Sequence, residues 1–126
     1  MTTTDTTSGT AAVTQVHHYY DLVDSGDVAG LVGLFTPDAV YHRPGYPPMR
    51  GHSDMTAFYD GARVIQEGRH TVSKVVTSGS DVAVHGIFVG VLRDGKPVEL
   101  RFSDFFEVVP DGRFSRRDTF FFAPLV

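Results

Sequence analysis

An acidic residue stands among phenylalanines late in the chain. Asp104 lies at the centre of the segment FSDFFEV, and as a strand this segment would place Phe102, Asp104 and Phe106 on one face. If that face is buried, desolvation raises the pKa of the carboxyl group, which makes Asp104 a candidate catalytic residue. A solvent-exposed aspartate and a structural ion pair with an arginine are the alternatives.

Histidine and tyrosine side chains supply further groups that transfer or donate protons. His85 stands in the segment VAVHGIFV and shares a face with Ile87 and Val89, which we expect to line the concave side of a sheet. A neutral imidazole there would move protons near pH 7, whereas the alternative is a purely structural histidine. Tyr19 and Tyr20 are adjacent, and periodicity alone leaves open which of them faces a pocket, since Tyr20 belongs to an apolar stripe.

Composition excludes several classes of function. The 126 residues carry a net charge of -4, which gives no support to a nucleic-acid or anionic-membrane partner. The absence of cysteine excludes disulfides, thiol catalysis and cysteine-ligated zinc. No apolar run approaches the ~20 residues of a membrane span, and the N-terminus lacks the pattern of a secretory signal. We therefore predict a cytoplasmic protein without metal or cofactor, because the histidines also lack ligand spacing.

The periodicity predicts helices first and strands afterwards. Residues 1–10 are polar and Thr-rich and are predicted to be a disordered tail, so that 11–126 form a single domain. Asp27 is predicted to cap the second helix, and Ser53 or Asp54 the third. The predicted helices span 11–24, 28–35 and about 54–66, and the predicted strands span 39–42, 69–78, 81–93, 97–109 and 113–122, with an irregular loop at 43–51. This order indicates an α+β fold in which helices cover a curved antiparallel sheet around a pocket.

Three segments carry a family resemblance. YYDLVDSGDVAGLVGLFTPDAVYHRPG, RGHSDMTAFYDG and the strands that follow resemble the NTF2-like superfamily, in particular the branch of ketosteroid isomerase and the SnoaL-like polyketide cyclases. The resemblance covers about residues 13–122. It implies a cone of three N-terminal helices packed on a strongly curved, mostly antiparallel sheet with an apolar pocket.

The resemblance to ketosteroid isomerase implies roles for particular residues. Its tyrosine and neutral carboxylic acid, which donate hydrogen bonds to an enolate oxygen, correspond to Tyr19 and Asp104. A supporting tyrosine corresponds to Tyr59. A cation facing Asp104, from Arg43 or Arg117, would lower the pKa of the carboxyl group and make it a carboxylate instead.

The family's proton-shuttling aspartate is replaced here. Its position is Arg43, and a guanidinium cannot act as a base near neutral pH. The resemblance therefore leaves His42 or His85 to move the proton. The adjacent His42 faces the same side only if its strand ends before it.

Two other branches fit less well. SnoaL-like cyclases often carry a His-x-Asp pair on the last strand, and those positions are Arg117 and Thr119 here. Asp118 lies between them and should face away by alternation. Limonene-type epoxide hydrolases need an Asp-Arg-Asp set, but the first and last of those positions are Gly90 and Thr119, so that function is rejected.

The predicted function is a cofactor-independent isomerase, cyclase or dehydratase that acts on a hydrophobic, carbonyl-bearing ring compound such as a polyketide or steroid. A non-catalytic binding module or dimeric accessory subunit is the alternative. Late aromatic residues, some of them on the convex face, predict a homodimer through that face, whereas core packing alone would also explain them. The residues predicted to bind the ligand are Arg43, Phe58, Tyr59, Phe102, Phe106, Arg117, Thr119 and Phe121.

Overall fold

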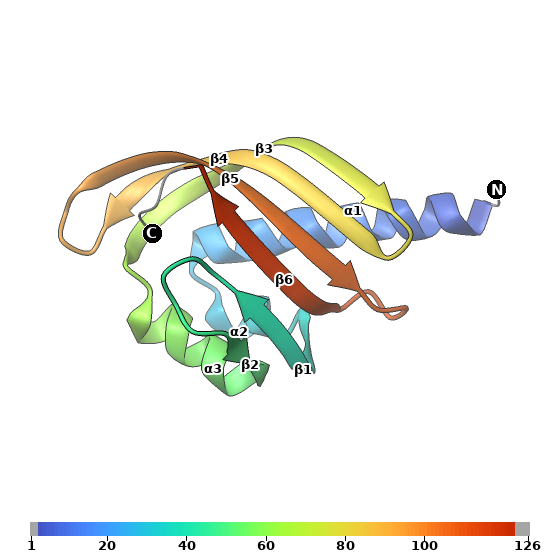
Figure 1. The fold of residues 1–126 in the computed structure, drawn as a ribbon, viewed down its shortest axis with the longest axis horizontal. Helices are drawn as coiled ribbons and strands as arrows, with labels where there is room; N and C mark the ends of the chain where they lie inside the picture. The colour runs from blue at the N-terminus through green and yellow to red at the C-terminus, as the bar shows by residue number, and fades with distance from the viewer. Residues whose placement is uncertain (1–2, 123–126) are drawn as a thin grey trace.

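One six-stranded sheet organises the protein. The computed structural model describes residues 3–122, with the side chains of residues 11–61 and 63–122 (Figure 1). The strands are β1 (Phe35–His42), β2 (Met49–Arg50), β3 (Ile65–Ser78), β4 (Asp81–Leu92), β5 (Pro97–Val108) and β6 (Phe114–Phe121), in the spatial order β2-β1-β6-β5-β4-β3. β3 to β6 form an antiparallel meander, and β1 joins β6 in parallel. The predicted α+β architecture with a curved, mostly antiparallel sheet is confirmed.

The helices lie along one side of this sheet. They are α1 (Thr3–Ser25), α2 (Val28–Val32) and α3 (Gly51–Ala57), which continues into a π-helical turn, η1 (Phe58–Ala62). Figure 1 shows the long strands bending over α1. Within the described residues, no helix combines the length and the apolar character needed to span a bilayer. α1 begins at residue 3 instead of 11, so residues 3–10 of the predicted tail are helical; residues 1 and 2 lie outside the described residues.

The link between the first two helices follows the sequence signals. Gly26 has a φ of 76°, a left-handed conformation that glycine adopts without strain, and it ends α1. The Asp27 side chain then accepts the backbone N–H of Gly30 at 2.9 Å, as predicted for a helix cap. α2 nevertheless ends before the predicted residue 35, because Phe35 already belongs to the first strand.

The third helix differs from its prediction at both ends. It begins at Gly51, and Asp54 accepts the backbone N–H of Arg50 at 2.9 Å instead of starting the helix. The helical segment ends at residue 62, and β3 begins at Ile65, four residues before the predicted strand. The loop predicted at 43–51 contains the short strand β2.

The two faces of the sheet have different roles. We call the face that carries the helices the inner face; on β4 it presents the buried Val82, Val84 and Phe88. The opposite, outer face presents Ile87 and Val89, which are 40% and 50% exposed. The prediction that these two residues line the concave side is therefore wrong.

A glycine on the inner face of β4 explains why Ile87 and Val89 were predicted on the wrong side. Gly86 is the inner residue at the middle of β4, and a Cβ atom there would lie 2.8 Å from the ring of Phe102 and 2.4 Å from the backbone oxygen of Thr71. Only a glycine leaves room for this packing. The inner face of β4 therefore includes a glycine that makes room for Phe102, and the bulk of Ile87 and Val89 does not identify that face.

Candidate functional site

A buried ion pair lies at the centre of the inner face. Asp104 on β5 accepts a hydrogen bond from the Arg117 side chain on β6 at 2.8 Å. The two side chains are 0% and 4% exposed. Removing such charges from water costs several kcal/mol per ion unless they are paired and hydrogen-bonded. The carboxylate must therefore find further donors.

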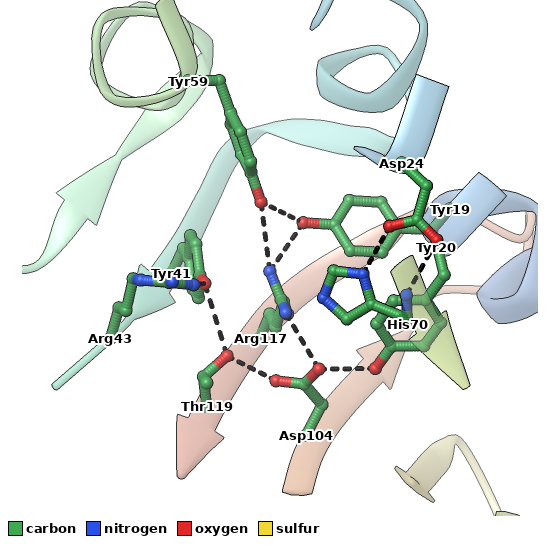
Figure 2. Close-up of polar contacts among 10 residues, drawn as sticks. All are labelled: Tyr19, Tyr20, Asp24, Tyr41, Arg43, Tyr59, His70, Asp104, Arg117 and Thr119. Carbon is green, nitrogen blue, oxygen red and sulfur yellow. Dashed lines mark hydrogen bonds and ion pairs between the residues drawn. The ribbon is translucent and has the colours of Figure 1, made fainter. Parts of the chain in front are cut away.

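Two hydroxyl groups complete the surroundings of Asp104. Tyr20 on α1 donates to Oδ2 at 2.5 Å, and Thr119 on β6 donates to Oδ1 (Figure 2). Burial alone would raise the pKa of Asp104, but the charge and hydrogen bond of Arg117 outweigh it, and with the two hydroxyls they lower that pKa. Asp104 is therefore a carboxylate near neutral pH and not a neutral hydrogen-bond donor.

Tyrosine hydroxyls surround the guanidinium of Arg117. It donates to Tyr19 at 2.7 Å and to Tyr59 at 3.1 Å, and those two hydroxyl oxygens lie 2.5 Å apart. The ring of Tyr41 lies beneath the guanidinium, at 4.5 Å from ring centroid to Cζ. Burial raises the pKa of both Tyr19 and Tyr59, so both remain neutral phenols that can donate.

A second arginine continues the network toward β1. Arg43 is 7% exposed and donates to the Tyr41 hydroxyl at 2.8 Å. Although burial favours the neutral phenol, the charges of Arg117 and Arg43 lower the pKa of Tyr41. The Tyr41 oxygen lies 3.3 Å from the Thr119 hydroxyl. Because Thr119 has one proton and gives it to Asp104, Tyr41 is the donor in this contact.

A histidine and an aspartate lie beside Tyr20. Asp24 on α1 holds His70 on β3 at two points, since it accepts from the backbone N–H at 2.9 Å and lies 2.6 Å from Nδ1. The His70 ring stacks on Tyr20 with a centroid distance of 5.0 Å. Burial lowers the pKa of His70 and so favours the neutral ring. Among the described residues, Nε2 has no hydrogen-bond partner.

Two cavities adjoin the ends of this network. The Arg63 cavity, of about 270 Å³, is lined by Tyr59, Arg63 and the apolar Val28, Leu31 and Ile65, among others. The His70 groove, of about 670 Å³, runs between α1 and β3 and is lined by Tyr20, Asp24, Arg69 and His70, among others. Asp24 lines both cavities. The network therefore adjoins one cavity at Tyr59 and the other at Tyr20.

Comparison with family models identifies the domain. The model of the SnoaL-like domain matches residues 16–117, most of the chain. The protein belongs to the SnoaL-like domain family. No curated protein matches the chain.

Solved structures share the SnoaL-like fold at low sequence identity. An NTF2-like protein of unknown function from Burkholderia pseudomallei has a TM-score of 0.81 at 20% identity, with 88% of this chain and 90% of that chain covered. The epoxide hydrolase/cyclase-like enzyme SalBIII, which has a role in pyran ring formation in the polyether salinomycin, has a TM-score of 0.78 at 21% identity, with 87% and 89% covered. A putative polyketide cyclase from Xanthomonas campestris pv. campestris has a TM-score of 0.73 at 20% identity, with 87% and 89% covered. These similarities show a common fold.

Most residues predicted for the site of this SnoaL-like domain lie on the inner face. Tyr19 contacts Tyr59 as expected, but it reaches Asp104 only through Arg117. The ring centroid of Phe102 lies 5.7 Å from that of Tyr20, and Phe106 lies 5.8 Å from Tyr19. The guanidinium of Arg43 lies 5.2 Å and 5.1 Å from the ring centroids of Phe58 and Phe121.

The two histidines predicted to move the proton lie on the outer face. His42 still belongs to β1, pairs with Asp118 in register, and its Nδ1 lies 2.9 Å from the Asp118 carboxylate. His85 contacts the Ser103 hydroxyl at 2.9 Å. Strand alternation separates both from Asp104, which faces the helices. No group of three described His, Asp or Glu residues is arranged to hold a metal ion.

Sequence reasoning missed four members of the network. Periodicity does not decide between Tyr20 and Tyr19, and no sequence signal used above selects Tyr41, Asp24 or His70. Asp24 and His70 are 46 residues apart, so no local motif joins them. The available signal was alternation, since Tyr41 lies one position from His42 on its strand and must face the other side.

Proposed function

We propose that this SnoaL-like domain is a cofactor-independent acid/base enzyme, an isomerase, cyclase or dehydratase that acts on a hydrophobic, carbonyl-bearing ring compound of polyketide or steroid type. The observation that carries this proposal is the buried network of Asp104, Arg117 and their tyrosines. Apolar side chains would fill the same space at lower cost, because buried charges bring a desolvation penalty. Charged groups kept beside cavities are characteristic of catalytic sites.

The hydroxyl of Tyr59 is the proposed contact for the substrate's carbonyl oxygen. Tyr59 lines the Arg63 cavity, and its hydroxyl contacts Arg117 and Tyr19. Negative charge that develops on a carbonyl oxygen at Tyr59 would be stabilised by the phenol and by the fixed positive charge of Arg117. In this proposal Tyr19, which contacts the Tyr59 hydroxyl, and Asp104, which acts through Arg117, are positioning residues.

His70 is the proposed proton carrier. A carboxylate oxygen only accepts hydrogen bonds, so the Asp24 contact places the ring proton of His70 on Nδ1 and leaves the lone pair on Nε2. Tyr59 and His70 line different cavities that share Asp24, so the substrate would extend past Asp24 to bring the carbon next to its carbonyl to Nε2. Nε2 would take the proton from that carbon, the C–H electron pair would form the enolate C=C bond, and the carbonyl π pair would move onto the oxygen. Return of the same proton to another carbon completes an isomerisation with no net change in atoms or electrons. His70 thereby takes the role first expected of His42 or His85.

The test is hydrogen–deuterium exchange of 2-tetralone, a bicyclic ketone, in D₂O followed by NMR. We expect the protein to accelerate exchange at the carbon next to the carbonyl, His70→Gln to abolish the acceleration, and Tyr59→Phe to reduce it about 100- to 1,000-fold. His85→Gln, on the outer face, is the matched control and should retain full activity. Unchanged exchange in both His70→Gln and Tyr59→Phe would overturn the assignment of the site.

A non-catalytic binding module is the second candidate. Two observations favour it: Arg43 stands where the resembling isomerases have their aspartate, and Asp104 already accepts hydrogen bonds from three side chains. A protein that binds 2-tetralone but leaves its exchange at the rate of buffer would support this candidate and rule out the enzyme.

The outer face supports a proposed homodimer. Large apolar side chains are exposed there on all four strands of the meander, and Val76, Phe105 and Phe120 among them line a groove of about 560 Å³. They include Val76, Ile87, Val89, Phe105 and Phe120. Exposed apolar surface of this kind usually marks an interface. Analytical ultracentrifugation should show a dimer that Phe105→Asp converts to monomer; a monomeric parent protein would contradict it.

A further inference from the structure

Arg63 is a partly buried cation that the proposed chemistry does not use. It follows η1 and lines the Arg63 cavity. Its Nε is buried without a hydrogen-bond partner, and among the described ion pairs none includes its guanidinium. Buried guanidinium groups are normally paired with an anion or fully hydrogen-bonded. The described residues therefore leave this cation without an anionic partner on the wall of a cavity.

The position of Arg63 is fixed by its surroundings. Its backbone N–H bonds the Phe58 oxygen at 2.9 Å, and its own backbone oxygen accepts from the Arg93 side chain at 2.6 Å. The guanidinium lies 5.4 Å from the ring centroid of Tyr59. This contact places the cation over the ring of Tyr59, whose hydroxyl is proposed to bind the substrate's oxygen.

The charges near Arg63 do not supply a counter-ion. Asp24, on the cavity wall, is engaged with His70, and Glu67 is an exposed residue outside ion-pair distance. Burial lowers the pKa of Arg63, and the positive charge of Arg43 lowers it further. The cavity therefore favours an anion over a neutral or cationic group.

We propose that Arg63 binds a carboxylate of the ligand, so that the substrate is a carboxylic acid whose ring lies beside Tyr59. The planar fork of a guanidinium matches the two oxygens of a carboxylate. Val28, Leu31 and Ile65 provide apolar contacts for a ring next to that group. At about 270 Å³ the cavity is smaller than a typical ligand pocket of ~300–1,000 Å³, so it takes one end of the molecule. As a statement about the substrate, this inference rests on the proposed function.

Calorimetric titration with a matched pair of probes tests the inference. We expect 2-naphthoate to bind at least about tenfold more tightly than 2-naphthamide, as a charge-assisted bidentate contact requires. Arg63→Gln should remove this preference and leave the affinity for the amide unchanged, whereas Arg63→Lys should retain part of it. Arg113→Gln, at a partly exposed arginine that precedes β6 and pairs with Asp111 outside both cavities, is the control and should keep the full preference.

The outcomes separate this inference from the enzyme proposal. Equal binding of the two probes, or a preference that survives Arg63→Gln, would overturn the carboxylate site. A preference that depends on Arg63 in a protein without 2-tetralone exchange would uphold the anion site and remove the enzyme. Exchange of 2-tetralone in a protein that binds the two naphthyl probes equally would uphold the enzyme and remove the anion site.

Discussion

Tyr20 on α1 and Asp104 on β5 are joined by a hydrogen bond of 2.5 Å across 84 residues of sequence. The neighbouring Tyr19 has no such bond to Asp104, although both tyrosines are buried. The first helix therefore places one phenol on the carboxylate and the next on Arg117. These contacts connect the helix to the two central strands of the network.

Removing the Tyr20 hydroxyl should destabilise the fold. Tyr20→Phe takes one of three donors from a fully buried carboxylate, and a hydrogen bond to a charged group contributes about 1.5–3 kcal/mol. Urea denaturation should show a loss of unfolding free energy in that range. Ser115→Ala, which removes an exposed hydroxyl bonded to a backbone oxygen at 3.3 Å, should change it by less than about 0.5 kcal/mol. A Tyr20→Phe variant as stable as the Ser115 variant would contradict the described contact.

The ion pair should show strong coupling in a double-mutant cycle. Arg117→Met leaves the Asp104 carboxylate buried without its cation and should cost about 3–5 kcal/mol. Asp104→Leu alone should lower the free energy of unfolding by a similar amount, because it leaves the Arg117 guanidinium buried without its anion. The double variant should be more stable than either single variant, since no buried charge remains. Additive losses would show that the two side chains do not interact in solution.

The meander was predictable because its signals are local. Two-residue alternation and the turn glycines gave strand bounds within one or two residues from 81 onward, and Gly79, Gly95 and Gly112 adopt the positive φ that those turns require. The short strand β2 was not predictable in this way. It exists because it pairs with β1, which is a tertiary contact and not a local preference.

The site residues could be predicted only where the sequence shows which face of the sheet each strand residue occupies. Asp104, Arg117 and Thr119 share the buried face because two-residue alternation holds through β5 and β6. His85 was placed on the wrong face, because the decisive inner residue of β4 is Gly86, whose contribution is the space it leaves for Phe102. The pairing of Asp24 with His70 depends on how α1 crosses β3, and no local pattern contains that information.

His70 should make stability depend on pH in a separate window from Asp104. Its folded pKa is lowered, chiefly by burial, in surroundings that include Asp24 and Tyr20 from α1, Asp104 from β5 and Arg117 from β6. Below the unfolded value of about 6.5, the unfolded chain therefore binds more protons than the folded one, and unfolding free energy falls as the pH falls. The lowered pKa of Asp104 acts in the same direction, but only below about pH 4.

Denaturation between pH 7.5 and 5 measures the His70 contribution. The slope of unfolding free energy against pH should not exceed about 1.4 kcal/mol per pH unit for one proton, and His70→Gln should flatten this slope. His85→Gln removes a histidine from the outer face and should leave the slope in place. A slope that is the same in both variants would show that another group is responsible.

The tautomer of His70 is the most direct test of its contact with Asp24. Long-range ¹H–¹⁵N spectra at pH 7.5 should show a proton on Nδ1 and none on Nε2, because the Asp24 oxygen 2.6 Å from Nδ1 accepts and cannot donate. Asp24→Ala removes this acceptor together with the contact to the backbone N–H, so the proton should then distribute between the two nitrogens. The spectrum of His85, whose Nδ1 faces the Ser103 hydroxyl, should not change in this variant and serves as the internal control. A protonated Nε2 in the unmodified protein would leave no lone pair for proton abstraction there and would remove His70 from the proposed reaction.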